Sequence, residues 1–348
     1  MRISSLLSYA GGFKEAVAEV QALEKAGLDV VWVPEAYSFD APSAMGYLAA
    51  QTERVTIASG ILPVYTRTPS LLAMTAAGID YLSDGRCMLG LGASGPQVIE
   101  GFHGIPYTAP VARIREAIEI CRSVWRRDRV QHMGEHYQIP LPQDQGTGLG
   151  KPLKLINHPV RENIPIAIAS LGPQSVAMTA EIADAWLPAF YTAEAAQAVW
   201  GDALRAGAAK RDPSLPPLEV FAGGAVAIGD GLEELRNLSR PQIALYVGGM
   251  GARSKNFYNQ IFTKSGYGDA AKEIQDLYLA GSKKEAEAAI PDEYLERNSL
   301  IGPEGFVKDR LAALKESGVT SLNVGFMGQT RDERVRNCET LRNLVDSL

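Results

Sequence analysis

The most constraining feature of this 348-residue chain is a regular alternation of short apolar segments with longer segments of helical period. Apolar strands that alternate with amphipathic helices indicate a parallel sheet covered by helices. Eight such units favour an α/β fold of the (β/α)8 TIM-barrel type over the alternative, an open doubly wound sheet. The predicted strands are residues 3–9, 28–33, 55–59, 87–92, 164–169, 184–188, 218–228 and 320–326, and the main predicted helices are 13–26, 42–51, 69–82, 112–127, 173–183, 193–209 and 331–348.

The domain organisation follows from this count. Residues 1–348 are expected to form a single barrel domain, because barrels run longer than the usual domain. Three stretches interrupt the alternation, namely 94–110, 130–160 and 245–300. We expect them to be inserted loops and helices that form the walls of a ligand pocket at one end of the barrel. Helical sequence is expected to continue from the seventh strand to about residue 315.

Composition excludes several classes of protein. With 34 Lys and Arg against 40 Asp and Glu, the net charge of −6 argues against a nucleic-acid or anionic-membrane partner. No apolar run reaches the ~18 residues of a membrane span, and the first residues do not resemble a signal peptide. Cys87, Cys121 and Cys338 lie far apart, which is typical of a reducing compartment. We therefore expect a cytoplasmic protein.

No metal site is expected. His132 and His136 have the i, i+4 spacing of a helical metal pair. The segment between them contains Gly134 in a sequence that reads as extended, which is a poor host for such a pair.

Residues 90–95, with the sequence GLGASG, match the dinucleotide fingerprint GxGxxG. That fingerprint needs a helix N-terminus directly against the pyrophosphate, and Pro96 follows here with the next helix expected about a dozen residues later. A Rossmann site is therefore disfavoured. Two interpretations stay open: the glycines end a barrel strand where a flat ligand touches backbone, or they relieve crowding inside a narrow barrel.

Two further strand ends carry signals. After the fifth strand, Gly172 and Pro173 open a helix at once, so the N–H groups of Gln174 and Ser175 can form an anion site. An ordinary strand-to-helix turn is the alternative interpretation. The third strand runs through Gly60 into a bent segment with Pro63, and a glycine in a strand often marks a bulge.

Taken in order, these segments resemble the bacterial luciferase-like superfamily, and within it the branch that uses the deazaflavin coenzyme F420. The resemblance covers nearly the whole chain. The motifs that carry it are residues 31–35 (VWVPE), 60–61 with 67–69, 90–95, 101–107 (GFHGIPY), 170–173 (SLGP), 249–258 (GMGARSKNFY) and 300–303 (LIGP).

The resemblance implies a set of cofactor contacts. Members of the family carry a non-prolyl cis peptide at the third-strand bulge, which here falls at Gly60–Ile61 beside Ser59. Glu35 matches an acidic position near the hydroxylated ring edge. The other implied cofactor-binding residues border the ring (Gly92, Ala93, Ser94) or hold the phosphate (Ser170, Gly172, Pro173, Gln174, Ser175).

The sequence departs from the family pattern at one position. Sugar-phosphate dehydrogenases of this branch follow the acid with a catalytic His, whereas Ala36 follows Glu35 here. A proton donor or acceptor must therefore come from elsewhere, and the candidates near strand ends are Glu100, His103, Tyr107 and Tyr37. Together with Glu35, Glu100 and His103 are the expected catalytic residues, although His103 could equally be an ordinary core or loop histidine.

The expected activity is hydride transfer between coenzyme F420 and an unidentified small organic substrate. One alternative is an FMN-dependent monooxygenase on the same barrel. The other is a barrel that binds flavin or deazaflavin without turnover. Family habit also implies a homodimer.

Overall fold

The computed structural model describes residues 1–8, 12–251 and 256–348, and it is a closed parallel barrel. The predicted TIM barrel is therefore confirmed, and an open doubly wound sheet is wrong, because β1 pairs in parallel with both β2 and β13. Parts of two sequence predictions fall on Tyr9 and on residues 252–255, which lie outside the described residues. The eight barrel strands, in order around the ring, are β1 (Arg2–Leu6), β2 (Val30–Val33), β3 (Thr56–Ser59), β5 (Cys87–Gly92), β8 (Ile166–Ala169), β9 (Ala185–Leu187), β10 (Glu219–Ala222) and β13 (Ser321–Phe326).

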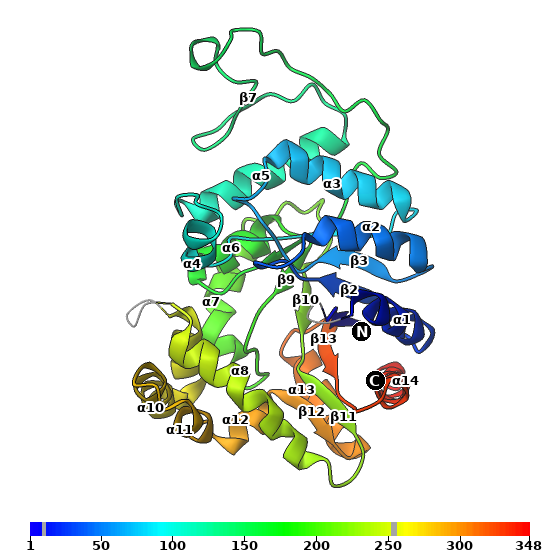
Figure 1. Ribbon diagram of the computed structural model, residues 1–348, viewed down its shortest axis with the longest axis vertical. Helices are drawn as coiled ribbons and strands as arrows, with labels where there is room; N and C mark the ends of the chain where they lie inside the picture. The colour runs from blue at the N-terminus through cyan, green and yellow to red at the C-terminus, as the bar shows by residue number, and fades with distance from the viewer. Residues whose placement is uncertain (9–11, 252–255) are drawn as a thin grey trace.

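Helices surround the barrel, as Figure 1 shows. Several begin with proline in the first turn, where a missing N–H costs nothing, and the side chains of Asp40, Thr68 and Thr330 each cap the helix that follows them. The surrounding helices are α1 (Phe13–Lys25), α2 (Ala41–Gln51), α3 (Pro69–Leu82), α5 (Pro110–Trp125), α6 (Pro173–Ile182), α7 (Ala196–Ala208), α13 (Glu304–Glu316) and α14 (Arg331–Asp346).

Large side chains fill the barrel interior. The rings of Trp32 and Phe221 meet edge to face with centroids 5.1 Å apart, and both are almost fully buried. The indole N–H of Trp32 donates to Ser4 Oγ at 2.8 Å, which satisfies the polar atom of a buried ring. The barrel is thus packed at its centre, and ligands must bind at its ends.

The predicted seventh strand, 218–228, is wrong as one continuous element. It divides at Gly223 and Gly224 into β10 and β11 (Ala225–Ile228), which pair with successive parts of β13. A Cβ on Gly223 would lie 2.6 Å from Asn323 O, and one on Gly224 would lie 2.2 Å from Asn298 O. The two glycines are therefore required where backbones approach closely.

Residues 299–302, predicted to be helical, instead form strand β12 (Ser299–Gly302), which pairs in parallel with β11. The rest of that region is helical as expected and has an apolar cluster of its own, around Phe262, Ile274 and Tyr294. Its helical elements are η2 (Glu233–Ser239), α8 (Arg240–Ala244), η3 (Leu245–Gly249), α9 (Phe257–Phe262), η4 (Thr263–Tyr267), α10 (Gly268–Leu279), α11 (Lys283–Ala288) and α12 (Asp292–Arg297).

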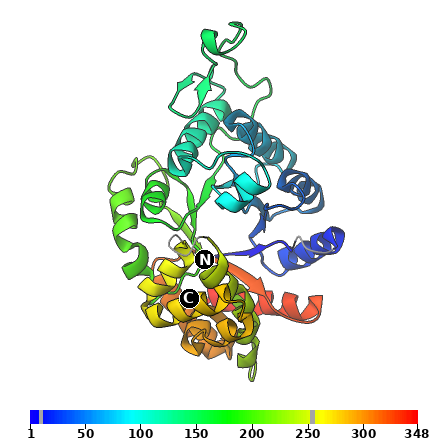
Figure 2. The same cartoon turned by 60° about the vertical axis from the view of Figure 1, so that its left-hand side comes forward.

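The other two interruptions differ from each other. The first contains helix α4 (Pro96–Gly101), so the expectation that no helix follows Gly95 directly is wrong. The second forms an arm with strands β6 (His132–Met133) and β7 (Gln138–Ile139) and the turn η1 (Gln143–Gln145). Figures 1 and 2 show this arm projecting away from the barrel, at the end opposite the 240–297 helices, so most of it does not wall a pocket.

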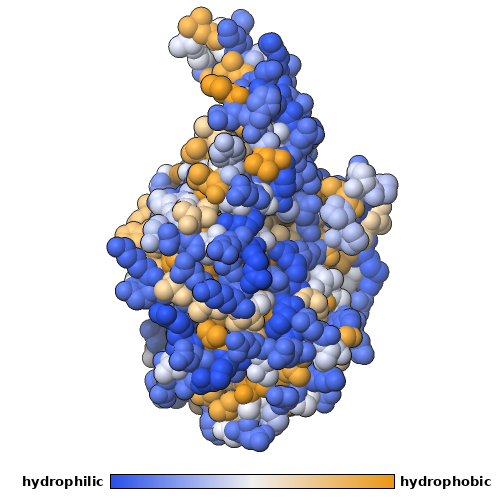
Figure 3. All heavy atoms as spheres, turned by 90° about the vertical axis from the view of Figure 1, so that its right-hand side faces the viewer, coloured by the Kyte–Doolittle hydropathy of each residue, from blue (hydrophilic) through white to orange (hydrophobic). Residues whose placement is uncertain are grey.

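The surface of the molecule is mostly hydrophilic in the view of Figure 3, and apolar atoms gather on the projecting arm. The arm's most exposed apolar side chains include Leu149 and Ile156. Across the described residues, none of the helices has the length and apolar character needed to cross a bilayer.

Candidate active site

The side chains and glycines singled out from the sequence lie where the barrel strands end. Parallel strands of a barrel all end on one face, and the loops that follow them build the functional site. Glu35 follows β2, Gly60 and Ile61 follow β3, residues 92–94 close β5, and Gly172 follows β8. These four strands are consecutive in the ring, so the fold brings their ends to neighbouring positions.

The Gly60–Ile61 peptide bond is cis, at the position that the family resemblance implied. The N–H of Gly60 donates to Val33 O at 2.7 Å, which joins the bulge to β2. A Cβ on Gly60 would lie 3.0 Å from Trp32 Cβ, and one on Gly92 would lie 3.0 Å from Ile61 Cγ1 and Cδ1. Both glycines therefore make room for neighbouring side chains of the barrel itself.

Two serines expected at the cofactor are committed to the protein instead. Ser59 is fully buried, and its hydroxyl donates to Gly90 O at 2.8 Å and accepts from Gly90 N at 2.8 Å. Ser170 is also buried, and its hydroxyl lies 2.8 Å from Thr179 Oγ1. Both side chains hold strand ends in place.

Glu35 forms an ion pair that the sequence analysis did not anticipate. Arg67 donates from Nη1 to Glu35 Oε1 at 2.6 Å and from Nη2 to Oε2 at 2.9 Å, and Ala41 N donates to Oε2 at 2.8 Å. The side chains of Arg67 and Glu35 are only 14% and 8% exposed. Both carboxylate oxygens already accept hydrogen bonds from the protein, so Glu35 is better suited to positioning than to contact with a reacting atom. Arg67 stands in one of the family-like motifs, but no sequence signal linked it to Glu35.

The start of α6 has the geometry of an anion site. Gly172 caps the helix in an extended conformation and Pro173 occupies its first position. The first-turn N–H groups of Gln174 and Ser175 have no intrahelical acceptors. The Ser175 hydroxyl donates to Gly172 O at 2.9 Å, so its proton is not available to an anion. A Cβ on Gly172 would lie 3.2 Å from Phe257 Cε1, which brings α9 beside the same turn.

Two tryptophans fix the loop between β8 and α6. The indole N–H of Trp186 donates to Ser170 O at 3.0 Å, and that of Trp200 donates to Leu171 O at 3.1 Å. Both rings are almost fully buried. These two hydrogen bonds from buried side chains therefore fix the backbone that leads into the anion-site turn.

The candidate proton carriers differ in their surroundings. Glu100 is exposed on α4 and accepts from Tyr107 N at 3.1 Å. The Tyr107 hydroxyl donates to Ser94 O at 3.2 Å, and burial raises the pKa of Tyr107. His103 Nε2 is buried and has no hydrogen-bond partner in the part of the chain that the structure describes. Tyr37 is 68% exposed, and its ring centroid lies 6.2 Å from that of Phe102.

Ser94 and Ala93 lie at the end of β5. Ser94 has a left-handed φ of 58°, uncommon for a residue other than glycine, and such positions concentrate at functional sites. Ala93 is partly buried against the core.

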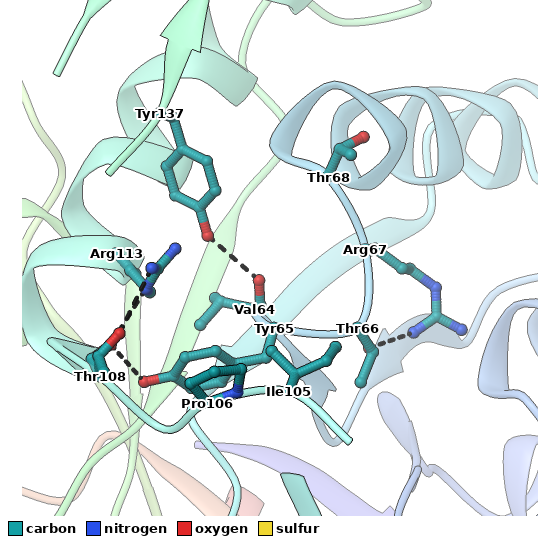
Figure 4. A pocket seen from close by; sticks show the side chains of 10 residues that line it. All are labelled: Val64, Tyr65, Thr66, Arg67, Thr68, Ile105, Pro106, Thr108, Arg113 and Tyr137. Carbon is teal, nitrogen blue, oxygen red and sulfur yellow. Dashed lines mark hydrogen bonds between the residues drawn. The ribbon is translucent and has the colours of Figure 1, made fainter. Parts of the chain in front are cut away.

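A cavity of about 450 Å³ lies beside this face, between the starts of α3 and α5 (Figure 4). It adjoins the site at two points. Arg67, which pairs with Glu35, lines the cavity. The ring of Tyr107, whose hydroxyl donates to Ser94 O, lies 5.1 Å from the ring of the lining residue Tyr65. Its lining residues are Val64, Tyr65, Thr66, Arg67, Thr68, Ile105, Pro106, Thr108, Arg113 and Tyr137.

In the described part of the chain, no group of three or more His, Cys, Asp or Glu residues is arranged to hold a metal ion. His132 lies on the arm, where Nε2 is 3.2 Å from Glu116 Oε2.

A closed barrel with candidate groups at the ends of consecutive strands defines a TIM-barrel protein with one functional face.

Comparison with known proteins places this barrel in a family. A family model described as luciferase-like monooxygenase matches residues 1–321. A Mycobacterium tuberculosis protein described as a "putative coenzyme F420-dependent oxidoreductase" is 39% identical over 318 residues, covering 90% of this chain and 91% of that protein. A 5,10-methylenetetrahydromethanopterin reductase of Archaeoglobus fulgidus is 26% identical over 322 residues, covering 88% and 87%.

Among solved structures, the coenzyme F420 dependent tetrahydromethanopterin reductase from Methanopyrus kandleri aligns with a TM-score of 0.77. The two chains are 18% identical, and the alignment covers 98% of this chain and 96% of the other. This likeness supports the fold. The chain belongs to the luciferase-like family, as the sequence motifs predicted.

Proposed function

We propose that this protein is a coenzyme F420-dependent oxidoreductase that transfers a hydride between the coenzyme and a small organic substrate. The proposal rests on the ordered strand-end groups, on the relative that is 39% identical, and above all on the turn that opens α6. The residues at that turn fit a phosphate of the coenzyme. First-turn N–H groups are free to hold a phosphate, and Gly172 has no Cβ that would obstruct its approach.

The proposed assignments follow from these contacts. Gly172, Pro173, Gln174 and Ser175 would hold the phosphate through backbone N–H groups, and Gly60 with Ile61 would support the ring. Gly92, Ala93 and Ser94 would border it. Ser59, Ser170 and Glu35 would act through their neighbours, since their polar atoms already bond the protein.

When bound, the coenzyme supplies a ring carbon that gives or accepts a hydride. The chain's own part is to orient substrate, exclude water and move a proton. We assign the proton to His103, because its Nε2 keeps a hydrogen-bonding capacity that no described residue uses. Glu100 and Tyr107 are the next candidates. A screen of reduced-coenzyme oxidation against enones, imines and ketones would identify substrates that turn over.

A second candidate function is an FMN-dependent monooxygenase, which the description of the family model favours. A barrel that binds cofactor without turnover is a third possibility; detectable turnover in the coenzyme screen would exclude it. Recovery of stoichiometric FMN from purified protein would favour the monooxygenase. Protein without bound flavin that binds the deazaflavin would favour the main proposal.

The phosphate site makes a direct prediction for Gly172→Asp. A carboxylate at the start of α6 would repel a phosphate and would also meet Phe257, so coenzyme affinity should fall at least about tenfold. The matched control is Gly305→Asp, since a Cβ there meets nothing within 4 Å at the start of α13. Unchanged affinity in Gly172→Asp, measured by fluorescence polarisation with circular dichroism as a check on folding, would contradict the assignment.

We also infer a homodimer in the cytoplasm. Along α3, the exposed apolar residues Leu71, Met74 and Tyr81 share one face, which a second copy could cover. The buried free cysteines Cys87 and Cys121 suit a reducing compartment. Light scattering after size-exclusion chromatography measures the oligomeric state, and a monomer at micromolar concentration would overturn the dimer.

A further inference from the structure

We infer that the cavity between the starts of α3 and α5 binds an organic anion, a carboxylate or a phosphate monoester attached to an apolar body. The first observation is the charge of its lining. Arg67 and Arg113 line it, and no acidic residue does. Arg67 is already neutralised by Glu35, so the free charge of the cavity is that of Arg113.

Arg113 is held in place without being neutralised. Its guanidinium carbon lies 5.7 Å from the ring centroid of Tyr65 and 5.5 Å from that of Tyr137, within the range of a cation–π contact. Nε donates to Thr108 O at 3.0 Å and Nη2 donates to Thr108 Oγ1 at 3.4 Å. Within residues 1–8, 12–251 and 256–348, no carboxylate pairs with Arg113 and its Nη1 has no acceptor. Figure 4 shows this side chain beside Tyr137 at the cavity wall.

Besides Arg113, the cavity has hydroxyl donors that no described residue uses. The Tyr65 hydroxyl donates to Thr108 O at 2.8 Å and the Tyr137 hydroxyl donates to Val64 O at 3.3 Å, so both protons are used. Burial raises the pKa of Tyr65 to about 12, which keeps that ring neutral. Thr68 Oγ1 accepts from Leu71 N and Thr108 Oγ1 accepts from Arg113, which leaves both hydroxyl hydrogens to donate. Free donors around an unpaired guanidinium select a ligand that is an acceptor and carries negative charge.

The remaining walls set the size and the body of the ligand. A volume of about 450 Å³ falls in the range of small-molecule sites. Val64, Ile105 and Pro106 add apolar surface, which an inorganic ion would leave unused. The ligand is therefore an organic molecule with one anionic end.

This site is separate from the proposed phosphate site. The cavity is built by residues 64–68 and 105–113 with Tyr137, whereas the phosphate turn follows β8 and is bounded by α9. Loss of one site should therefore leave the other intact.

The test uses benzoate and phenyl phosphate as probes, with neutral benzamide for comparison, in calorimetric titrations of the full-length protein. Each titration is repeated in Gly172→Asp so that phosphate bound at α6 is not counted. Saturable binding of either anion, at least about tenfold tighter than benzamide, is expected. Tighter binding of benzoate assigns a carboxylate ligand, and tighter binding of phenyl phosphate assigns a phosphate monoester.

Arg113→Gln should weaken anion binding at least about tenfold, and Thr108→Val, which removes one donor at nearly constant shape, should weaken it less. The control is Arg126→Gln on the same helix, where Arg126 is 51% exposed and pairs with Asp128. Coenzyme binding should be the same in all three variants, which separates failure of this site from failure of the proposed function. Wild-type protein that binds neither anion, or equal losses in Arg113→Gln and Arg126→Gln, would overturn the inference.

Discussion

Glu35 and Arg67 show how a residue that the family resemblance marks for the cofactor can have a structural task of its own. The pair is nearly buried and bidentate, and it joins the loop after β2 to the loop before α3. Removal of one partner leaves the other as an uncompensated buried charge. A role for Glu35 at the ring edge would therefore depend on Arg67.

Arg67→Met should lower the free energy of unfolding by about 3 kcal/mol, because Glu35 would keep only the Ala41 N–H. The double variant Glu35→Gln with Arg67→Met removes both charges and should recover most of that loss. Urea unfolding measures both values. A loss in Arg67→Met below the error of the method, or a double variant no more stable than the single one, would contradict this account.

His103 carries the second prediction at this scale. With a substrate found in the reduced-coenzyme screen, His103→Gln should lower kcat roughly 10²- to 10⁴-fold while coenzyme affinity stays unchanged. His158→Gln is the matched control, since the His158 ring contacts the Arg127 side chain at an exposed position. Wild-type kcat in His103→Gln would move the assignment to Glu100 or Tyr107.

At the scale of elements, several glycines stand where the backbones of neighbouring strands approach closely. β3 and β5 are joined through Ser59 and Gly90, and β10 and β11 are separated by two glycines that face the backbone of β13 and the residue before β12. Glycines of this kind look alike in the sequence. The sequence leaves two interpretations for Gly90 and Gly92, a ligand contact or relief of crowding, and the contacts of Gly90 favour the second for that residue.

Gly90→Ala tests this interpretation. A Cβ on Gly90 would lie 1.8 Å from Ser59 O, so β3 and β5 would have to separate. We expect a destabilisation of about 3 kcal/mol or more. Gly95→Ala, in the loop after the same strand, meets nothing within 4 Å and should be neutral. Thermal and urea unfolding compare the two, and equal stability would refute the packing argument.

The sequence predicts the barrel because apolar runs alternate with segments of helical period along most of the chain. It misses β12 because four residues in a helical region are too few to show a period of their own. It misses the ion pair between Arg67 and Glu35, which lie 32 positions apart in the sequence. It also misses the cavity at Arg113, where the guanidinium contacts Tyr65 from 48 positions away. Only the fold brings these side chains together. Strand ends can thus be located from local pattern, whereas ion pairs and cavities across the face cannot.

For the whole molecule, the barrel concentrates its candidate groups on one face, and the arm and the 240–297 helices extend to opposite ends (Figures 1 and 2). The net charge of −6 does not predict the anion sites, since the same chain presents free N–H donors at α6 and an unpaired guanidinium in the cavity between α3 and α5. Local donors determine which anions bind.

The central claim is that this barrel binds coenzyme F420 at the face formed by β2, β3, β5 and β8. Titration of the coenzyme with the purified protein, followed by fluorescence polarisation, measures it most directly. The account predicts saturable binding at micromolar concentration by protein that carries no bound FMN. Unchanged polarisation, or protein that purifies with stoichiometric FMN and does not exchange it for the deazaflavin, would contradict it.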